Sequence, residues 1–248
     1  MVRKGKLYIG TSGWHYKHWV GTFYPEKTRD ADQLAFYFCH FNTVELNNSF
    51  YHLPPPQTFM NWRKATPGKF LFAVKASRFI THMKKLNVEK DSIKLLFRSI
   101  SKLKDKLGPI LFQLPPKWNV NAERLRSFLK KLPKKYLYSF EFRNPSWYTE
   151  EIFSLLRKHN CAFCIYELAG HRSPKEVTAD FVYIRFHGPT SAKYAGSYSD
   201  TTLKRWATLC LQWQNEGKDV YVYFDNDQSG YAAFNAQSLT RFTTGKKK

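Results

Sequence analysis

Hydrophobic and polar positions alternate along FVYIRFHG, residues 181–188. Three apolar side chains share one face of the predicted strand, while Tyr183, Arg185 and His187 share the other. Burying polar and charged side chains of this kind is costly unless they find partners. The segment therefore predicts a strand with an apolar face packed on the protein and a polar face directed toward a site.

The same alternation recurs along the chain. Further strands are predicted at 6–12, 43–47, 70–77, 109–114, 138–143, 162–167 and 220–226. Helical patterns lie between most of them, at 30–41, 56–65, 92–107, 121–132, 146–160, 199–218 and 230–242. Asn121 and either Ser199 or Asp200 are expected to cap their helices, and Gly108 and Gly217 to end theirs. A short segment near 173–180 follows the sixth strand in place of a long helix.

This order of elements predicts the fold class. Strands that alternate with helices form parallel sheets with helical crossovers. Eight such units in 248 residues match the size of an α/β protein with a single (β/α)8 TIM barrel. We expect one domain over residues 1–244 and a basic tail over 245–248. An open doubly wound sheet is the alternative, but GTSGW lacks the GxGxxG pattern of dinucleotide-binding folds.

Polar residues of the predicted strands lie toward their C-terminal ends, where barrels build their active sites. Glu45, Glu141, His187 and Asp225 are the candidate catalytic residues, as carboxylates and an imidazole for proton transfer. Neighbouring cations are expected to keep the carboxylates ionised, which favours base or electrostatic roles. A purely structural network of buried ion pairs is the alternative.

Cationic and aromatic side chains in the same region predict a binding site for an anion. Arginine holds phosphate or carboxylate through two parallel hydrogen bonds. Aromatic rings stack on bases and sugars, although they would equally cap a barrel as a small core. The predicted substrate-binding residues are Trp14, His15, Asn47, Tyr51, Lys75, Gln113, Arg143, Trp147, Arg185, Tyr194, Tyr223 and Asn226.

Metal binding is not favoured by the sequence. DNDQSG, residues 225–230, resembles the start of a calcium loop, but its twelfth position is Ala236 rather than glutamate. His187 is the histidine that most clearly faces inward. We therefore predict no metal ligands. The identity of any cofactor stays open, and a divalent metal is an unfavoured alternative.

The net charge of +21 and the pI of about 9.8 indicate an anionic partner, either a small molecule or nucleic acid. Basic runs at 101–107, 129–136 and 245–248 supply much of this charge, although a solvated lysine-rich surface would look the same. The sequence shows neither a signal peptide nor a membrane span. Its four cysteines fit a reduced cytoplasm, and the oligomeric state stays open.

Six motifs occur in order along the chain: GTSGWHYKHWVGTFYP (10–25), FNTVELNNSFYHLPP (41–55), LFQLPP (111–116), EFRNPSW (141–147), YIRFHG (183–188) and YVYFDNDQSGYAAFNA (221–236). Together they resemble the YecE-like family, also called domain of unknown function 72. The resemblance runs from about residue 6 to residue 240 and implies a TIM barrel. It implies no particular reaction. The barrel of this family is similar to those of the xylose-isomerase and apurinic-endonuclease group in fold alone.

Three functions follow as hypotheses. The first is an enzyme that binds a phosphate-bearing substrate, with a nucleic-acid phosphoesterase as its most specific form. The second is an acid–base enzyme on a carbohydrate or small anionic metabolite, using Glu45 and Glu141. The third is a nucleic-acid-binding protein without catalysis, using its basic surface.

Overall fold

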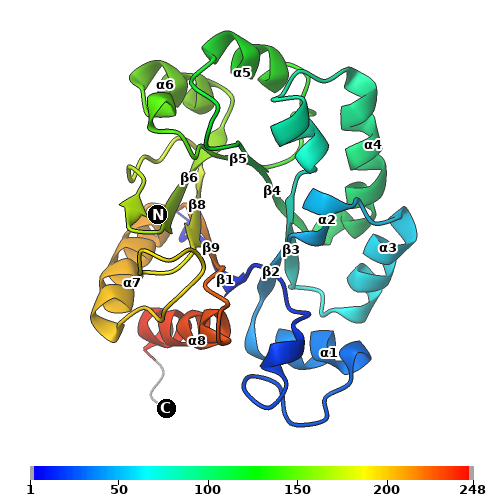
Figure 1. Ribbon diagram of the computed structural model, residues 1–248, viewed down its shortest axis with the longest axis vertical. Coiled ribbons are helices and arrows are strands. Elements are labelled where there is room, and N and C mark those ends of the chain that lie inside the picture. Colours follow the sequence, from blue (N-terminus) through cyan, green and yellow to red (C-terminus); the bar gives the residue numbers. More distant parts are fainter. Residues whose placement is uncertain (1–2, 246–248) are drawn as a thin grey trace. The chain divides into compact units, whose positions relative to one another are not determined.

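The computed structural model describes residues 3–245, and Figure 1 labels its elements. Eight of its strands correspond to the eight that the alternating pattern predicts. They are β1 (Leu7–Thr11), β2 (Thr43–Leu46), β3 (Leu71–Lys75), β4 (Leu107–Gln113), β5 (Tyr138–Glu141), β6 (Cys161–Leu168), β8 (Phe181–Phe186) and β9 (Asp219–Phe224).

Helices separate most of these strands. The α-helices are α1 (Asp30–His40), α2 (Asn48–Tyr51), α3 (Pro56–Ala65), α4 (Lys90–Ile100), α5 (Ala122–Leu129), α6 (Glu150–Lys158), α7 (Asp200–Asn215) and α8 (Tyr231–Thr244). Short 3-10 helices are η1 (Lys17–Trp19), η3 (Ser101–Lys106) and η4 (Pro145–Trp147), and η2 (Phe79–Met83) is a π-helix. The predicted caps are confirmed: Asn121 accepts from the N–H of Arg124 at 2.8 Å, and Ser199 from that of Thr202 at 3.3 Å.

The strand order along the sheet is β1-β9-β8-β6-β5-β4-β3-β2. The first and last strands of the chain pair in parallel, from Leu7 opposite Val220 to Thr11 opposite Phe224. An open doubly wound sheet keeps such strands apart, so that alternative is wrong. The chain is an α/β protein with a single (β/α)8 TIM barrel.

Two local expectations need correction. The helix predicted over 92–107 ends as α4 at Ile100 and continues as η3, in which the backbone kinks at Lys104, where φ is 52°. Lys106, counted in a basic surface run, is only 6% exposed, and its Nζ donates to the carbonyls of Arg63 at 2.6 Å and Thr66 at 2.5 Å. This lysine satisfies carbonyls at the end of α3, which a helix leaves without partners.

The sequence also missed one element. After β6 the chain forms β7 (His171–Arg172), a two-residue strand that pairs antiparallel with β6. The predicted short segment without a long helix then leads to β8. This is the place where the helix cover of the barrel is thinnest along the chain.

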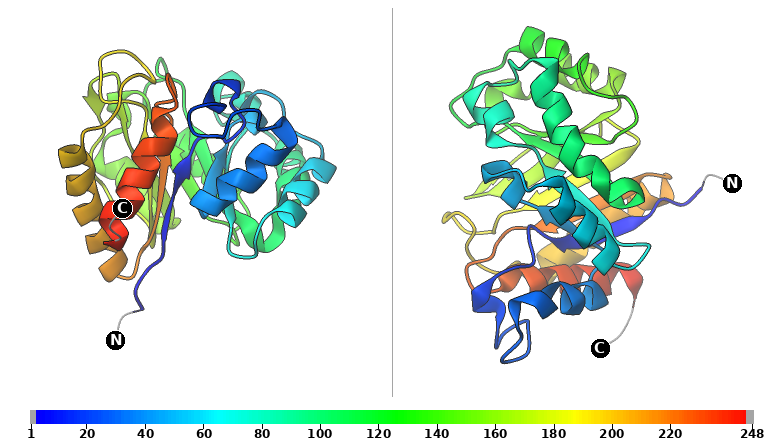
Figure 2. Two further views of the ribbon diagram at one scale, coloured as in Figure 1. Left: turned by 90° about the horizontal axis from the view of Figure 1, so that it is seen from below. Right: turned by 90° about the vertical axis from the view of Figure 1, so that its right-hand side faces the viewer.

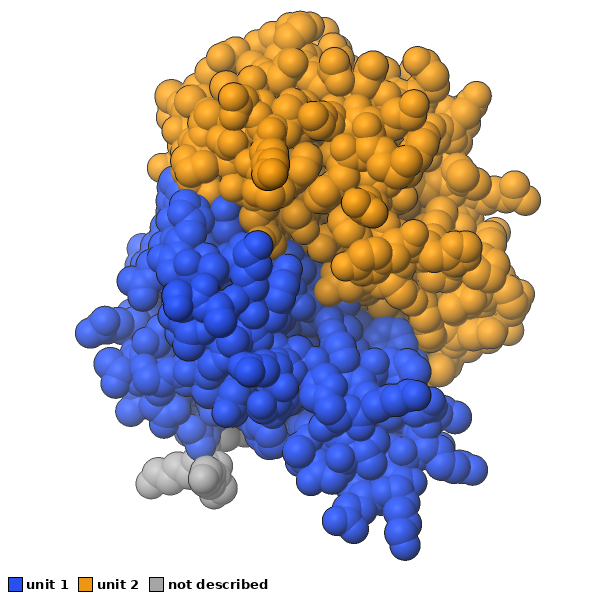
Figure 3. All heavy atoms as spheres, viewed as in Figure 1, with its two compact units in different colours: residues 1–45, 165–175, 180–248 blue, residues 46–164, 176–179 orange. Residues whose placement is uncertain are grey.

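The chain divides into two compact units, shown in Figure 3. Among the described residues, unit 1 comprises 3–45, 165–175 and 180–245, and unit 2 comprises 46–164 and 176–179. One domain over 1–244 stays a prediction, and the predicted tail beyond Gly245 lies outside the described residues.

Unit 1 has a parallel sheet of β1, β9 and β8 covered by α7 and α8, which pack side by side in Figure 2. Phe186 of β8 packs on Trp206 of α7 with ring centroids 5.0 Å apart. The apolar face of FVYIRFHG therefore points to the helices, as its alternation predicts. The polar face, with Tyr183 and Arg185, is left for the site.

Unit 2 has a parallel sheet of β3, β4, β5 and the start of β6. Phenylalanines form its outer face: Phe140 stacks on Phe112 at 5.3 Å and on Phe142 at 6.2 Å. Phe128 of α5 packs edge-on against Phe112 at 5.1 Å. Offset and edge-on contacts of this kind add to the energy of buried area, and they fix Glu141 on the opposite face of β5.

No helix within residues 3–245 is both long and apolar enough to cross a bilayer.

Candidate functional site

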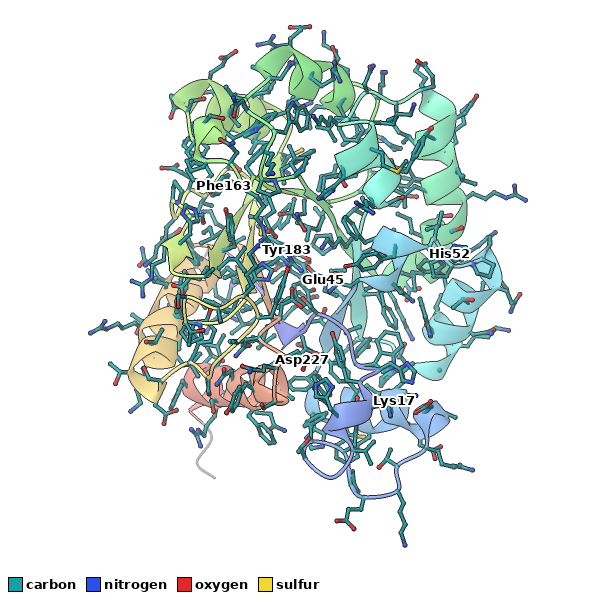
Figure 4. All side chains as sticks on the ribbon, in the orientation of Figure 1. Lys17, Glu45, His52, Phe163, Tyr183 and Asp227 are labelled. Atoms are coloured by element: carbon teal, nitrogen blue, oxygen red, sulfur yellow. The ribbon has the colours of Figure 1, made fainter. Side chains whose placement is uncertain are left out.

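Glu45 of β2 is the centre of a buried hydrogen-bond network in unit 1. Its carboxylate has no exposed surface. Oε1 accepts from Ser12 Oγ at 2.7 Å and from Arg185 Nη2 at 2.7 Å, and Oε2 accepts from Tyr183 Oη at 2.6 Å. Figure 4 shows Glu45 and Tyr183 side by side. The carboxylate accepts all three hydrogen bonds, which suits an electrostatic role better than proton donation.

Tyr183 and Arg185 reach this network because they share one face of β8. Burial, followed by the charge of Glu45, raises the pKa of Tyr183 well above its usual value, so the phenol stays a donor. The Arg185 guanidinium is fully buried and also lies 3.3 Å from Asp225 Oδ2. Two carboxylates therefore surround one guanidinium, and the group as a whole is not cationic.

His187 and Asp225 form an oriented pair at the ends of β8 and β9. His187 Nδ1 lies 2.9 Å from Asp225 Oδ2, and His187 Nε2 lies 3.3 Å from Nη1 of Arg185. An ionised carboxylate only accepts and a guanidinium only donates. The partners therefore assign the proton to Nδ1 and the lone pair to Nε2, which is the tautomer of a general base.

Asp227 lies beyond Asp225 in a different environment. Its Oδ1 accepts from Trp19 Nε1 at 2.6 Å, and its Oδ2 lies 3.0 Å from His18 Nε2. The pKa of Asp227 is raised to about 6, mainly by burial and with a smaller contribution from Asp225, against the lowering effects of Trp19 and His18. Unit 1 thus holds a carboxyl group whose charge changes near pH 6, and this group is not among the predicted catalytic or substrate-binding residues.

Other predicted residues of unit 1 surround this network. Tyr223 is buried and shares a hydrogen bond of 2.8 Å with Thr43 Oγ1. Asn226 Nδ2 donates to the Gly196 carbonyl at 2.8 Å and to Asn235 Oδ1 at 2.8 Å. These contacts tie the end of β9 to the loop after β8 and to α8, which is a positioning role.

Three aromatic or imidazole candidates of unit 1 differ in exposure. Tyr194 is 44% exposed and packs edge-on against His187, with centroids 5.6 Å apart. Trp14 is half-buried, and its carbonyl accepts from Tyr24 Oη at 2.5 Å. His15 is exposed and lies 3.3 Å from Asp30. Tyr194 thus touches the His187 ring directly.

Unit 2 holds a second polar group. Glu141 of β5 is fully buried and is ion-paired to Arg143 Nε, and Cys164 Sγ lies 3.8 Å from its other oxygen. The Arg143 side chain is only 8% exposed. This is the buried pairing that the sequence left open as the structural role of Glu141.

Lys75, at the end of β3, adds positive charge to unit 2. Its Nζ lies 4.2 Å above the Phe50 ring, and the His82 ring packs edge-on against the same phenylalanine at 5.1 Å. The pKa of His82 is lowered to about 4, mainly by burial and then by Lys75, Arg78 and Arg143, in that order, against a raising effect of Glu141. His82 is therefore neutral near pH 7, in surroundings with an excess of positive charge.

The remaining predicted residues of unit 2 differ in their exposure to solvent. Trp147 is fully buried, stacks on Phe142 at 4.8 Å and donates to the Trp118 carbonyl at 2.7 Å, which is the core role that the sequence left open. Gln113 is 9% exposed and donates to the Leu114 carbonyl at 3.4 Å. Asn47 is half-buried, and Tyr51 is 80% exposed.

Sequence reasoning missed Ser12, Arg78 and His82. Ser12 lies in GTSGW, just past β1, where strand alternation ends. Arg78 and His82 belong to the turn and π-helix after β3, and π-helices occur often at functional sites without a reliable sequence signal. A search for polar residues within a few positions of each strand end would have found all three.

Gly188, which follows β8, approaches the backbone of its own loop closely. Gly188 has φ of 108°, and a Cβ there would lie 2.3 Å from the Ala195 carbonyl oxygen. Its N–H donates to Tyr198 Oη at 3.1 Å. Glycine is thus required at this position for a close backbone approach. Across 3–245, no three His, Cys, Asp or Glu side chains gather as ligands for a metal ion.

Comparison with known proteins identifies relatives along the whole chain. UPF0759 protein YunF of Bacillus subtilis (strain 168) is 28% identical over 265 residues, covering 94% of this chain and 93% of the relative. UPF0759 protein YecE of Escherichia coli (strain K12) is 30% identical over 145 residues, covering 58% of this chain and 51% of the relative. Both matches fit the motifs recognised in the sequence.

A solved structure of a DUF72 family protein from Thermotoga maritima MSB8 superposes with a TM-score of 0.87 at 29% identity, covering 96% of this chain and 99% of that one. The family model described as "Protein of unknown function DUF72" matches residues 8–248. The chain therefore belongs to the DUF72 family.

Proposed function

We propose that the chain is an enzyme that binds an anionic, phosphate-bearing substrate at the C-terminal ends of its strands and hydrolyses a phosphoester. The observation that carries the proposal is the position of Lys75, whose Nζ lies over the Phe50 ring against which His82 also packs. Lys75, Arg78 and Arg143 all lower the pKa of His82, and Glu141 acts against them. Positive charge gathered at a strand end attracts phosphate, and residues there serve catalysis in this fold class.

The two kinds of cation would bind a phosphate differently. Lys75 provides a compact charge held above Phe50, which suits any phosphate oxygen. Arg143 is fixed by Glu141, and a fixed guanidinium supplies directed hydrogen bonds. In unit 1, Arg185 is already neutralised by Glu45 and Asp225. Within unit 2 we therefore assign phosphate binding chiefly to Lys75, with Arg143, which pairs with one carboxylate, as a directed donor. Within unit 1 we assign a positioning role to Arg185, which pairs with two carboxylates.

Within unit 1, His187 is the residue that we propose as a proton acceptor. Asp225 holds its Nδ1 proton at 2.9 Å and leaves the Nε2 lone pair for a proton. When a water attacks phosphorus, its proton passes to the imidazole, the bond from phosphorus to the ester oxygen breaks, and that oxygen takes up a proton from solvent. A carboxylate beside the imidazole stabilises the imidazolium that forms. The Arg185 contact at Nε2 must give way when that proton arrives, so Arg185 and His187 act as one unit.

Turnover of phosphoesters by matched variants tests this proposal. A panel of phosphomonoesters and end-labelled single-stranded, duplex and abasic oligonucleotides would be assayed at near-physiological salt, with and without chelator. His187→Gln is expected to lower kcat by roughly 10²–10⁴-fold, as for the loss of a general base. Lys75→Gln is expected to raise KM by about tenfold, equivalent to roughly 1.4 kcal/mol of binding.

An exposed lysine supplies the control. Lys94 pairs with Asp91 on the surface of α4, and Lys94→Gln changes charge by the same amount as Lys75→Gln. Its kinetics are expected to match wild type. Wild-type protein without turnover of any phosphoester, or an unchanged kcat in His187→Gln, would refute the proposed reaction.

A carbohydrate acid–base enzyme is less well supported. That reaction needs one carboxyl that donates a proton, whereas Glu45 accepts hydrogen bonds from Ser12, Arg185 and Tyr183. Glu141 is likewise held by Arg143. Both carboxylates are arranged as acceptors, which fits an electrostatic role.

Nucleic-acid binding remains the alternative that the net charge of +21 favours. Lys130, Lys134 and Lys135 of the basic run are exposed, whereas Lys131 donates to the Val88 carbonyl at 2.8 Å. Gel shifts that vanish when the three exposed lysines become glutamine, yet persist in His187→Gln, would support binding without catalysis. The proposed location is the cytoplasm, which suits a chain with four cysteines and no disulfide among its described residues.

A further inference from the structure

A small cavity lies in unit 1 beside α7, next to the place where β7 follows β6 instead of a helix. Its volume is about 150 Å³. Residues Thr202, Arg205 and Trp206 of α7 form one wall, and Glu167, Arg172 and Lys175 form the other. A regular crossover helix after β6 would have covered this flank of α7 with side chains of its own.

The lining of this cavity is strongly charged. Arg172, Lys175 and Arg205 carry positive charge, and Glu167 is the acidic member of the lining. All three cations are exposed, so they can turn toward a ligand at little cost in desolvation. The excess of two positive charges matches a dianion.

The floor of the cavity is fixed by buried contacts. Glu167 is only 7% exposed, and burial raises the pKa of its carboxyl group, whereas the nearby cations Arg172 and Lys175 and the side chains of Trp206 and Tyr198 lower it. Arg172 Nε lies 3.5 Å from Glu167 Oε1, and Lys175 Nζ lies 4.8 Å above the Trp206 ring. Two of the cations are thus already held at the cavity by partners on its floor.

The position on α7 adds to this field. Thr202 is the third residue of a sixteen-residue helix that begins at Asp200. A helix N-terminus carries partial positive charge and favours anions within its first turn. The helix end and the three cations therefore act in the same direction.

We propose that this cavity is a phosphate-binding site, which takes a phosphate dianion either free or as the terminal group of a nucleotide. Cavities for drug-sized ligands span roughly 300–1,000 Å³, so a cavity of 150 Å³ accepts one small group rather than a whole cofactor. The site does not use Lys75, Arg143 or His187, and it does not rest on the proposed enzymatic function.

A larger cavity in unit 2, of about 420 Å³, is less favourable for an anion despite Lys134, Lys158 and His159 in its lining. It lies where α6 ends at Lys158 and just beyond the end of α5 at Leu129. Helix C-termini carry partial negative charge and favour lysine for structural reasons. Its lysines are explained without a ligand, whereas the cations beside the start of α7 are not.

Isothermal titration calorimetry with inorganic phosphate tests the site, at low ionic strength and about pH 7.5, where phosphate is mostly dianionic. Arg205→Gln is expected to weaken the binding to this site by about tenfold, and Arg172→Gln with Arg205→Gln to abolish it at millimolar phosphate. Lys204→Gln is the control, because Lys204 is the neighbouring residue of α7 and its Nζ lies over Phe242 instead, at 5.3 Å from the ring centroid.

Two further arms make the result specific. Glu167→Gln removes the acidic charge from the floor and is expected to tighten phosphate binding several-fold, opposite to the arginine variants. Thymidine 5′-monophosphate binding as tightly as phosphate, with thymidine not binding, would identify a terminal phosphate as an acceptable ligand, whereas binding of phosphate alone would identify the free ion.

The proposal fails if Arg205→Gln and Lys204→Gln weaken phosphate binding equally, since surface charge alone would then explain it. It also fails if the double arginine variant binds phosphate as wild type does. The double variant Lys75→Gln with Arg143→Gln lacks the phosphate binding assigned to the proposed enzyme site. Any heat of phosphate binding that persists in this variant, and that disappears when Arg172 and Arg205 are also changed, belongs to the cavity.

Discussion

Replacing Arg185 by methionine tests whether the buried network of unit 1 is a main source of stability. The change keeps a long apolar side chain but removes the charge between Glu45 and Asp225. Removing one partner of a buried ion pair typically costs about 3–5 kcal/mol. Glu45 keeps Ser12 and Tyr183 as donors, and Asp225 keeps His187, so we expect about 3 kcal/mol, at the low end.

This loss is large against the roughly 5–15 kcal/mol that stabilises most domains. It corresponds to a fall in Tm of about 6–12 °C for a chain of this size. Urea unfolding followed by tryptophan fluorescence would give the free energy, and calorimetry the Tm. In a double-mutant cycle with Glu45→Gln, the combined loss should be smaller than the sum by at least about 1 kcal/mol, because the two residues are in contact.

Arg29→Met is the matched control. Arg29 makes an ion pair with Asp32 at 2.7 Å, but its side chain is 80% exposed. Exposed pairs contribute less than about 1 kcal/mol, so this variant should unfold close to wild type. If Arg185→Met costs no more than Arg29→Met, the network is not a source of stability and the reasoning is refuted.

Three further outcomes follow from other groups. Lys106→Met should lower the free energy of unfolding by about 2–3 kcal/mol, because the carbonyls that end α3 lose their donor, while exposed Lys104→Met should leave it unchanged in the same urea assay. Asp227 has a pKa of about 6 against an ordinary 3.8 and therefore binds a proton more tightly in the folded state. Its contribution to the free energy of unfolding is present at acid pH and is lost as pH rises from about 4 to about 6. Asp227→Asn should remove this pH dependence between pH 4 and 6, and an unchanged dependence would contradict the reasoning. The His82 imidazole should titrate near pH 4 by NMR, and Lys75→Gln should move its pKa upward.

Strand alternation was sufficient to predict the eight main strands and the proximity of the Glu45 and Arg185 side chains. These two residues are 140 positions apart, yet the parity of each strand places both on its polar face, and burial forces such groups to pair. The helix caps were equally readable, since Asn121 and Ser199 satisfy N–H groups by local geometry alone.

Features set by irregular backbone or by distant acceptors could not be read in this way. Lys106 sits in a basic run and has the sequence signature of a surface lysine, but its partners are carbonyls of another helix. His82 lies in a π-helix, whose residues follow neither the helical nor the strand period. Trp147 belongs to a motif rich in polar residues, yet its packing on Phe142 depends on a turn that only the folded chain defines.

The network around Glu45 also determines when unit 1 can fold during synthesis of the chain. Glu45 leaves the ribosome 140 residues ahead of Arg185, which at about 5–20 residues per second amounts to roughly 7–28 s. During this interval its carboxylate stays in water, and the sheet of unit 1 waits for β8 and β9. Unit 2, completed by residue 179, can collapse earlier. A nascent chain arrested after residue 179 should therefore present one protease-resistant unit and a hydrated N-terminal segment that holds Glu45.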